Sequence, residues 1–356
     1  MDKPLIIPFF IPHAGCPFTC IFCNQWEISG AEEIARPEEI RPRVISYLAA
    51  HKKKSSWCEV AFFGGSFTGL ALELQNELLQ AAHLLKDEGI IQGIRLSTRP
   101  DYINHQIVQN LVVHGVTTVE LGVQSLVDEV LEKSCRGNCS QDVVEATRAL
   151  RDYPIELIFQ LMPGLPGDSR AYAQLTANRV VQLAPDGVRI YPTLVMKGTA
   201  LETWYKEGLY QPWSLDEAVE IGAEWLGIFS AYKIKVIRLG LQATDNLSPE
   251  ADFLAGPYHP AYGELVKSRL FLEQLTTILD SLEDSSGPLT IYCNPRDYSK
   301  VTGQRSINVR KLTQTYNISR INIKADPDLS PMDLRIATLD ETKALSRQEF
   351  LKKYRI

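Results

Sequence analysis

The sequence predicts an α/β protein: a partial, TIM-like (β/α)6 barrel with a smaller α+β extension at its C-terminal end. Three observations predict this fold. Segments rich in β-branched and aromatic residues alternate with segments of helical periodicity, which is the pattern of βα units around a parallel sheet. Glycine- and proline-rich breakers separate these segments at regular intervals. After Ser214 the regular alternation of strand and helix segments ends, and a longer helix and a separate set of strands follow.

The barrel is predicted from six strands, each followed by a helix. Strands are expected over residues 5–11, 58–63, 93–98, 117–123, 155–161 and 187–194. Helices are expected over residues 37–50, 71–87, 104–114, 141–151, 169–184 and 199–208. Because the chemistry of a βα barrel collects on the loops after the C-terminal ends of its strands, we expect the functional residues on those loops.

The extension is predicted to begin close to Gln242. A long helix with Ser214 as its N-cap and a strand over residues 234–241 complete the barrel domain, which we place at residues 1–242. An α+β domain, a candidate for substrate or RNA binding, is predicted at residues 243–356. In it we expect helices over residues 260–282 and 299–316 and strands over residues 289–295 and 318–324.

Composition excludes several classes of protein. With 356 residues, 45% hydrophobic and 22% charged, the chain can bury a substantial core and is not disordered. Its longest apolar runs are interrupted by proline and fall short of the ~20 residues of a membrane helix, and its start lacks the pattern of a secretory signal. We therefore expect a cytoplasmic protein. Seven cysteines do not resemble a secreted disulfide framework, and Cys135 and Cys139 are expected to be structural or free.

The strongest chemical pattern is a cysteine loop directly after the first strand. Cys16, Cys20 and Cys23 have the spacing Cys-x3-Cys-x2-Cys, and thiolates on one short loop can hold an iron–sulfur cube. One iron then lacks a protein ligand, which marks a position for a substrate or cofactor. Two alternatives stay open: a zinc site completed by His13, and three thiols packed as small apolar groups.

With Phe22 before the third cysteine, this loop resembles that of the radical S-adenosylmethionine superfamily. The resemblance implies a [4Fe–4S] cluster ligated by Cys16, Cys20 and Cys23, with S-adenosylmethionine chelating the open iron. It also implies a 5′-deoxyadenosyl radical that removes a hydrogen atom from the substrate, and a reducing partner of the flavodoxin or ferredoxin type.

Later strand ends carry the other residues that the resemblance assigns to the cofactor. A Gly-Gly pair follows the second strand, Gln124 ends the fourth strand, and Arg136 lies twelve residues further on. Ser97 stands where relatives resembling the oxygen-independent coproporphyrinogen oxidases have an acidic residue. The predicted cofactor-binding residues are Phe22, Gly64, Gly65, Ser66, Ser97, Gln124, Arg136 and Gln160.

Phrases at residues 63–69, 97–103 and 119–125 resemble the radical domain of the Elongator catalytic subunit, which modifies wobble uridines of transfer RNA. The resemblance covers residues 5–242 and implies a radical enzyme of transfer RNA modification. Elongator subunits also carry an acetyltransferase domain, and no matching phosphate-binding loop is evident after residue 243. Two alternatives stay open: a radical enzyme acting on a small molecule such as a porphyrin precursor, and a non-catalytic RNA-binding protein with a structural cluster.

Two further features concern the substrate. Tyr191 and Lys197, at the end of the sixth strand, are the candidate catalytic residues, a tyrosine to relay hydrogen or electrons and a lysine to hold an anion. Between residues 291 and 324, seven basic residues stand against one acidic residue, a local charge of +6 in a chain of net charge −6. Interleaved tyrosines make this stretch compatible with contacts to RNA phosphates and bases. These tyrosines are Tyr292, Tyr298 and Tyr316.

Overall fold

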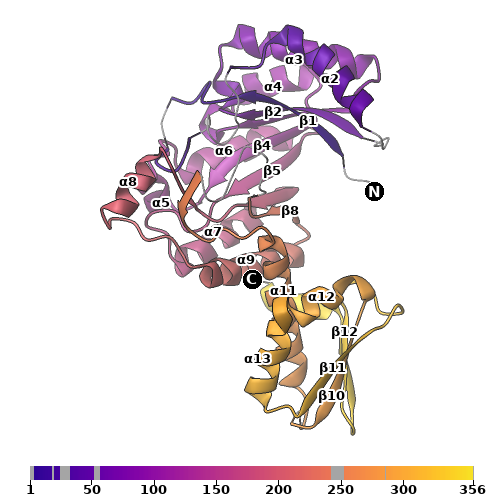
Figure 1. Cartoon of the computed structure of the whole chain (residues 1–356). Helices are drawn as coiled ribbons and strands as arrows, with labels where there is room; N and C mark the ends of the chain where they lie inside the picture. The colour runs from indigo at the N-terminus through magenta and orange to yellow at the C-terminus, as the bar shows by residue number, and fades with distance from the viewer. Residues whose placement is uncertain are drawn as a thin grey trace. The chain divides into compact units, whose positions relative to one another are not determined.

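The computed structural model describes two compact units (Figure 1). The described residues are 4–17, 20–24, 33–51, 57–241, 252–284 and 286–355. The first unit comprises Met1–Trp213 and Leu241–Pro257, and the second comprises Ser214–Gly240 and Tyr258–Ile356. The domain boundary predicted between residues 242 and 243 falls outside the described residues and stays a prediction.

The first unit is a curled parallel sheet wrapped by helices. In the described part of the chain its strands pair in sequence order: β1 (Leu5–Ile11), β2 (Cys58–Gly64), β3 (Gly93–Thr98), β4 (Thr118–Gln124), β5 (Glu156–Leu161) and β6 (Gly187–Ile190). The seventh strand in the order of this sheet is β8 (Lys235–Leu239), whose residues belong by their contacts to the second unit. The predicted class, a partial TIM-like barrel with α/β layers, is confirmed.

Helices connect these strands, as the βα pattern predicted. They are α2 (Pro37–Ala50), α3 (Leu72–Asp87), α4 (His105–Val113), α5 (Asp128–Lys133), α6 (Ser140–Arg151), α7 (Arg170–Leu183) and α8 (Ala200–Lys206). Two 3-10 turns, η1 (Phe67–Gly69) and η2 (Pro100–Tyr102), follow β2 and β3. A short ribbon pairs β7 (Val195–Met196) antiparallel to β9 (Phe253–Ala255). Helix α5 was not predicted.

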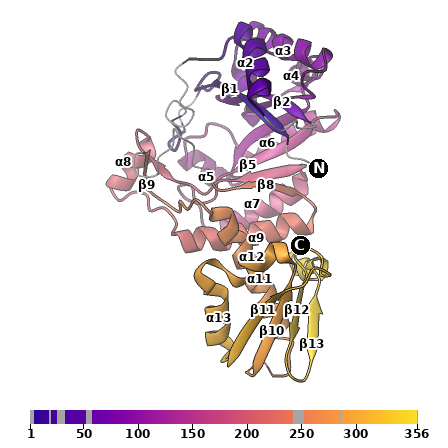
Figure 2. The same ribbon diagram turned by 45° about the vertical axis from the view of Figure 1, so that its right-hand side comes forward.

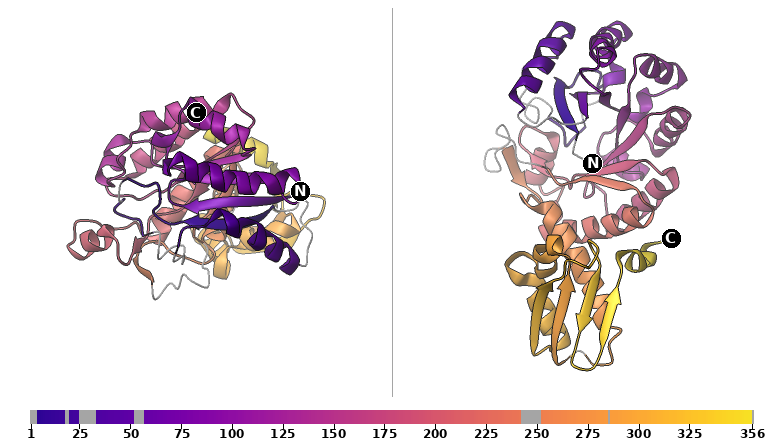
Figure 3. Two further views of the ribbon diagram at one scale, coloured as in Figure 1. Left: turned by 90° about the horizontal axis from the view of Figure 1, so that it is seen from above. Right: turned by 90° about the vertical axis from the view of Figure 1, so that its right-hand side faces the viewer.

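The two faces of the curled sheet differ in chemistry. Successive strand residues point to opposite faces, and the face toward the helices is apolar. Phe9 and Phe62 on that face are fully buried, and Arg43 of α2 lies over the Phe9 ring at 5.1 Å. The opposite, inner face carries charged residues such as Arg95 and Glu120. Figure 3 shows the helices along the outer side of the curled sheet, so the inner face is where a polar site can form.

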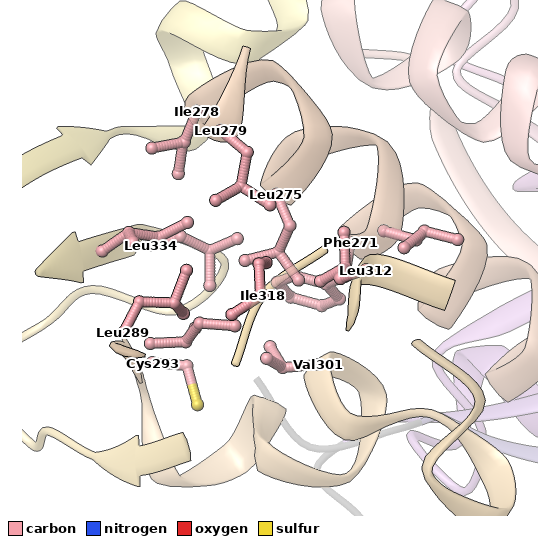
Figure 4. Packing of buried hydrophobic residues seen from close by; sticks show 13 residues of the cluster. Phe271, Leu275, Ile278, Leu279, Leu289, Cys293, Val301, Leu312, Ile318 and Leu334 are labelled. Carbon is pink, nitrogen blue, oxygen red and sulfur yellow. The ribbon is translucent and has the colours of Figure 1, made fainter. Parts of the chain in front are cut away.

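The second unit packs helices on a mixed sheet of order β11-β10-β12-β13 (Figure 2). Leu289, Ile291 and Cys293 of β10 point into the core shown in Figure 4, against α11 and α13. The strands are β10 (Pro288–Cys293), β11 (Arg320–Ala325), β12 (Leu334–Ala337) and β13 (Thr342–Leu345). The helices are α9 (Leu215–Ala231), α11 (Tyr262–Leu279), α12 (Tyr298–Thr302), α13 (Ile307–Tyr316) and α14 (Arg347–Leu351), with turns η3 (Pro295–Asp297), η4 (Gln304–Ser306) and η5 (Lys352–Tyr354).

Two local expectations were wrong, and two strands of the second unit were missed. The helix predicted over residues 299–316 is broken at Gly303, whose φ of 77° leaves the helical region. The sixth strand ends at Ile190 because Pro192 follows and cannot donate to a ladder. Strands β12 and β13, of four residues each, were not predicted.

The predicted N-cap is confirmed, since Ser214 Oγ accepts a hydrogen bond from Glu217 N. Among the described helices, none is long and apolar enough to cross a bilayer.

Candidate active site

Glycines seat the cysteine loop against the loop that follows β2. The Gly65 N–H donates to Ile11 O and the Ser66 N–H to Ala14 O, each at 2.9 Å. A Cβ on Gly65 would lie 2.1 Å from Ala14 O, and one on Gly15 would lie 2.1 Å from Ser66 O. Only glycine permits this approach. The predicted Gly-Gly pair is therefore the backbone surface against which the cysteine loop lies.

The turn from Cys20 to Cys23 is fixed by backbone hydrogen bonds to two distant segments. Cys23 N donates to Cys20 O at 3.0 Å and closes the turn. Ile21 N donates to Ser134 O at 3.3 Å, and Leu201 N donates to Ile21 O at 2.8 Å. The turn is thus held between the end of α5 and the start of α8.

Phe22 lies in the hydrophobic cluster behind this turn. It is 9% exposed and belongs to the same cluster as Cys20, Val130, Leu165 and Leu201. The ring of this predicted cofactor-binding residue therefore packs against protein, where it anchors the turn.

Arg136 connects the cysteine turn to the end of β4. Its Nη1 donates to Cys20 Sγ at 3.3 Å, and its Nη2 donates to Gly122 O. The residue is 6% exposed, and its Nε has no hydrogen-bond partner among the described residues. A buried donor without a partner is unfavourable unless a ligand accepts from it.

Gln124 has the second unpartnered polar atom beside this guanidinium. Its φ of 65° is left-handed, and the β4–β5 register shifts between Gly122 and Gln124. Non-glycine residues in this conformation cluster at functional sites. The buried Oε1 of Gln124 has no partner among the described residues. A Cβ on Gly122 would lie 2.8 Å from Arg136 Nη2 and 3.2 Å from Gln124 Nε2, so the glycine keeps open the place where the two side chains meet.

The three predicted cluster ligands lie on one loop, but their thiols do not form a closed metal site. Cys16 and Cys23 are half-buried and Cys20 is buried. Burial raises the pKa of the Cys16 thiol, while the nearby positive charges of Arg136 and Arg99 act in the opposite direction. In the described ranges, no three His, Cys, Asp or Glu side chains are grouped to hold a metal ion. The assignment of the three cysteines, and its zinc alternative, stay predictions.

Ser66 is held by hydroxyl groups of the neighbouring strand. Its Oγ lies 2.9 Å from Thr98 Oγ1 and accepts from the Arg99 N–H at 3.2 Å. Thr68 Oγ1 lies 2.6 Å from the same Thr98 hydroxyl. Ser66 is fully buried, and Gly64 before it turns with a φ of 108°. The Ser66 hydroxyl thus joins the loops after β2 and β3.

A buried ion-pair network spans the inner face of the sheet. Arg95 pairs with Glu59 and Glu120, each at 2.8 Å, and Glu120 also pairs with Arg189 at 2.9 Å. Arg189 Nη1 donates to the hydroxyl of Tyr191 at 3.3 Å. These contacts place the candidate catalytic tyrosine at one end of a chain of charges. Sequence reasoning missed the network, although a charged residue within an apolar strand was the available indication.

The remaining predicted residues divide between the inner face and the surface. Strand register places Ser97 beside Glu120, and Gln160 beside Gly122, with both predicted residues half-buried. They therefore share the inner face with Tyr191. Lys197 is exposed just after β7, and its backbone N donates to Asp252 O at 3.0 Å. The structure does not bring Lys197 together with the rest.

A pocket of about 370 Å³ lies at the loop between β5 and α7. Trp204 and Trp213 are among its lining residues, with Tyr210, whose hydroxyl donates to Gly164 O at 2.6 Å. Asp168 accepts hydrogen bonds from two backbone N–H groups, but its burial dominates and raises its pKa to about 6. Sequence reasoning marked this loop only by its glycines and prolines and missed the carboxyl group.

Comparison with known proteins defines the class. The Radical SAM superfamily model matches residues 10–180, and the Radical SAM C-terminal domain matches residues 185–271. The chain belongs to the radical S-adenosylmethionine superfamily. It is an enzyme, and its cofactors are the [4Fe–4S] cluster and S-adenosylmethionine that this superfamily uses.

Within that class, the chain is similar to transfer RNA-modifying proteins over its radical domain. It is 42% identical over 125 residues to a tRNA uridine(34) acetyltransferase of Dehalococcoides mccartyi, covering 34% of this chain and 27% of that one. It is 32% identical over 141 residues to human Elongator complex protein 3, covering 38% and 25%. The matched stretches thus span about a quarter of these relatives.

A solved structure supports the fold. The archaeal Methanocaldococcus infernus Elp3 with an N-terminal deletion matches with a TM-score of 0.60 at 23% identity. The match covers 77% of this chain and 63% of that chain. At this identity the likeness concerns the fold.

Proposed function

We propose that this radical S-adenosylmethionine enzyme modifies transfer RNA at the wobble uridine. The observation that carries the proposal is the 42% identity over 125 residues to a tRNA uridine(34) acetyltransferase, which lies in the radical domain. The local charge of +6 in an otherwise acidic chain supports a polyanionic substrate.

In this proposal Cys16, Cys20 and Cys23 hold the cluster, and Arg136 and Gln124 bind S-adenosylmethionine. The polarity of the two unpartnered atoms fits that cofactor's amino-acid end: Arg136 Nε can donate to its carboxylate, and Gln124 Oε1 can accept from its amino group. Bound together and reduced, the two cofactors supply a 5′-deoxyadenosyl radical that removes a hydrogen atom from the substrate.

The inner face supplies the substrate groups of the proposal. Tyr191 reaches the site with its hydroxyl oriented by Arg189, which Glu120 holds in turn. Ser97 and Gln160 add polar contacts on the same face. Lys197, exposed to solvent, contacts an RNA phosphate. A reductase partner of the flavodoxin or ferredoxin type delivers the electron.

The first experiment tests the cluster and its chemistry. Anaerobically reconstituted protein is assayed for iron, and then for 5′-deoxyadenosine after addition of dithionite and S-adenosylmethionine. We expect Cys16→Ser, Cys20→Ser and Cys23→Ser each to lose both the bound iron and the formation of 5′-deoxyadenosine. Cys135→Ser, an exposed cysteine outside the loop, is the matched control and keeps both. A fully loaded cluster that yields no 5′-deoxyadenosine indicates a non-catalytic protein.

The second experiment tests the substrate. Mass spectrometry compares nucleosides of transfer RNA from cells with and without the chain. We expect one wobble-uridine derivative to disappear and to return with the wild-type chain but not with the Cys20→Ser variant. Unchanged nucleosides, together with 5′-deoxyadenosine formation by the purified enzyme, indicate a small-molecule substrate instead.

A further inference from the structure

Among the described residues of the second unit, helices cover one face of its sheet and leave the other face open. Leu289, Ile291 and Cys293 of β10 point into the core with α11, α12 and α13. The alternate residues of β10, Thr290 and Tyr292, therefore point to the other face. Figure 1 shows α11 and α13 on one side of strands β10 to β12. We call the other side the open sheet face.

Strand register assembles the open sheet face from three strands. Lys324 of β11 is the register partner of Tyr292 on one side, and Arg335 of β12 is its partner on the other. Asn322 lies beside Thr290 in the same way. The polar residues of this face on β10, β11 and β12 are Thr290, Tyr292, Arg320, Asn322, Lys324 and Arg335.

Tyr292 and Arg335 form a stacked pair at the centre of this face. The guanidinium carbon of Arg335 lies 4.6 Å from the centroid of the Tyr292 ring, a cation–π distance. Asp326 accepts a hydrogen bond from Arg335 Nη2 at 2.6 Å and fixes the guanidinium. Both planes are half-buried, so each keeps surface available to a partner. A nucleic acid base stacks on such aromatic and guanidinium planes.

The charge of the face matches a polyanion. Among the residues of its four strands that point to this side, Arg320, Lys324 and Arg335 are basic and none is acidic. Asp326, directly after β11, offsets the charge of Arg335, so Arg320 and Lys324 supply the net positive charge. The five other basic residues of the stretch lie on other elements: Arg296 in η3, Lys300 in α12, Arg305 in η4, and Arg310 and Lys311 in α13. Tyr316 is not on this face, since its hydroxyl donates to Asp280 Oδ1. Arg320 and Lys324 are therefore the two basic residues of the stretch at residues 291–324 that lie on this face, and Arg335 adds a third from outside that stretch.

We propose that the open sheet face binds single-stranded RNA. Tyr292 and Arg335 stack on unpaired bases, and Lys324 and Arg320 contact phosphates on the flanking strand. Thr290 and Asn322, which are register partners on the same face, can hydrogen-bond to base edges. The inference rests on the proposed function, because it names the surface that holds a loop of the transfer RNA substrate.

Binding is measured by fluorescence anisotropy of the full chain with a labelled single-stranded oligonucleotide and a labelled anticodon stem–loop. We expect Tyr292→Ala to weaken binding about tenfold through loss of stacking, and Tyr292→Phe to retain it. Lys324→Gln should lower the slope of log affinity against log salt by about one contact. The matched control, Arg305→Gln with Arg310→Gln, removes two charges away from the face.

Three outcomes overturn the proposal. The first is that Tyr292→Ala and Tyr292→Phe both bind the labelled RNA with the same affinity as the wild type. The second is a loss in the Arg305/Arg310 control as large as that in the face variants. The third is equal competition by heparin and RNA, which shows a general anion surface. Thermal melts verify that each variant is folded.

A separate readout distinguishes this inference from the proposed function. Formation of 5′-deoxyadenosine without RNA should be the same in Tyr292→Ala as in the wild type. If this activity is present and no RNA binds, the open sheet face is wrong while the radical enzyme stands. If RNA binds through Tyr292 and the loaded protein forms no 5′-deoxyadenosine, the proposed function fails while the RNA surface stands.

Discussion

Arg136 Nη1 lies 3.3 Å from Cys20 Sγ, across 116 residues of sequence. The same guanidinium donates from Nη2 to Gly122 O at the end of β4. One side chain thus joins the cysteine turn to the strand that ends at Gln124. Nε of this guanidinium is buried without a partner in the described part of the chain, which supports the proposal that Arg136 binds an anionic group.

Replacing Arg136 with glutamine should weaken S-adenosylmethionine binding while the three cysteines stay intact. A charge-assisted hydrogen bond is worth about 1.5–3 kcal/mol, so the Kd should rise roughly ten- to hundredfold. Equilibrium dialysis of reconstituted protein gives the Kd, and an iron assay gives the cluster content. Arg148→Gln, an exposed change on α6, should have no effect. An unchanged Kd in Arg136→Gln excludes the carboxylate contact.

Gly65→Ala should displace the cysteine loop. The new Cβ would lie 2.1 Å from Ala14 O, so the backbone of the loop has to move. We expect the free energy of unfolding to fall by about 3 kcal/mol and the iron content after reconstitution to fall with it. Urea unfolding and an iron assay measure the two. Gly287→Ala, where the Cβ meets no atom within 4 Å, is the control and should keep both values.

Glu120→Gln should destabilise the inner face. The carboxylate pairs with both Arg95 and Arg189, and removing one partner from a buried ion pair costs about 3–5 kcal/mol. Urea unfolding gives the change. Glu88→Gln removes an exposed carboxylate that pairs with Arg41 and should change stability far less, because solvent screens that pair. Equal effects of the two variants contradict a buried network.

Stability should depend on pH through Asp168. Its pKa is about 6 in the folded chain against 3.8 for an ordinary aspartate, so the folded state keeps its proton longer. The free energy of unfolding should therefore fall as pH rises from about 4 to 6, by about 3 kcal/mol. Urea unfolding at several pH values, followed by tryptophan fluorescence, measures the slope.

The Asp168→Asn variant supplies the comparison for this slope. We expect the asparagine to remove the fall between pH 4 and 6, since it cannot titrate. Glu73→Gln, an exposed change on α3, should keep the wild-type slope. A wild-type slope in Asp168→Asn assigns the pH dependence to another group.

The barrel was predictable from sequence because its signals are local. Each βα unit carries its own periodicity and its own breaker, so the order of β1 to β6 follows from the chain itself. The break at Gly303 was missed because helical periodicity continues on both sides of it. Strands β12 and β13 were missed because four residues are too few to show alternation.

The site was less predictable, because most of its contacts join residues far apart in sequence. Glu120 and Arg189 lie in sequence motifs that were interpreted through other residues. The two side chains meet only because the sheet register places their strands together. Likewise, no spacing rule indicates that Arg136 reaches the Cys20 thiol. Tyr191 and Lys197 were predicted together at the end of a sixth strand that was expected over residues 187–194. With the strand ending at Ile190, the lysine lies on the surface.

The two backbone hydrogen bonds of Ile21 have a consequence for the order of biosynthesis. The cysteine turn is translated before both of its backbone partners, Ser134 and Leu201, which lie far downstream in the chain. A nascent chain that ends before Leu201 cannot complete the turn. We therefore expect the metal centre to be assembled after most of the barrel has been translated, when Ile21 can form both hydrogen bonds.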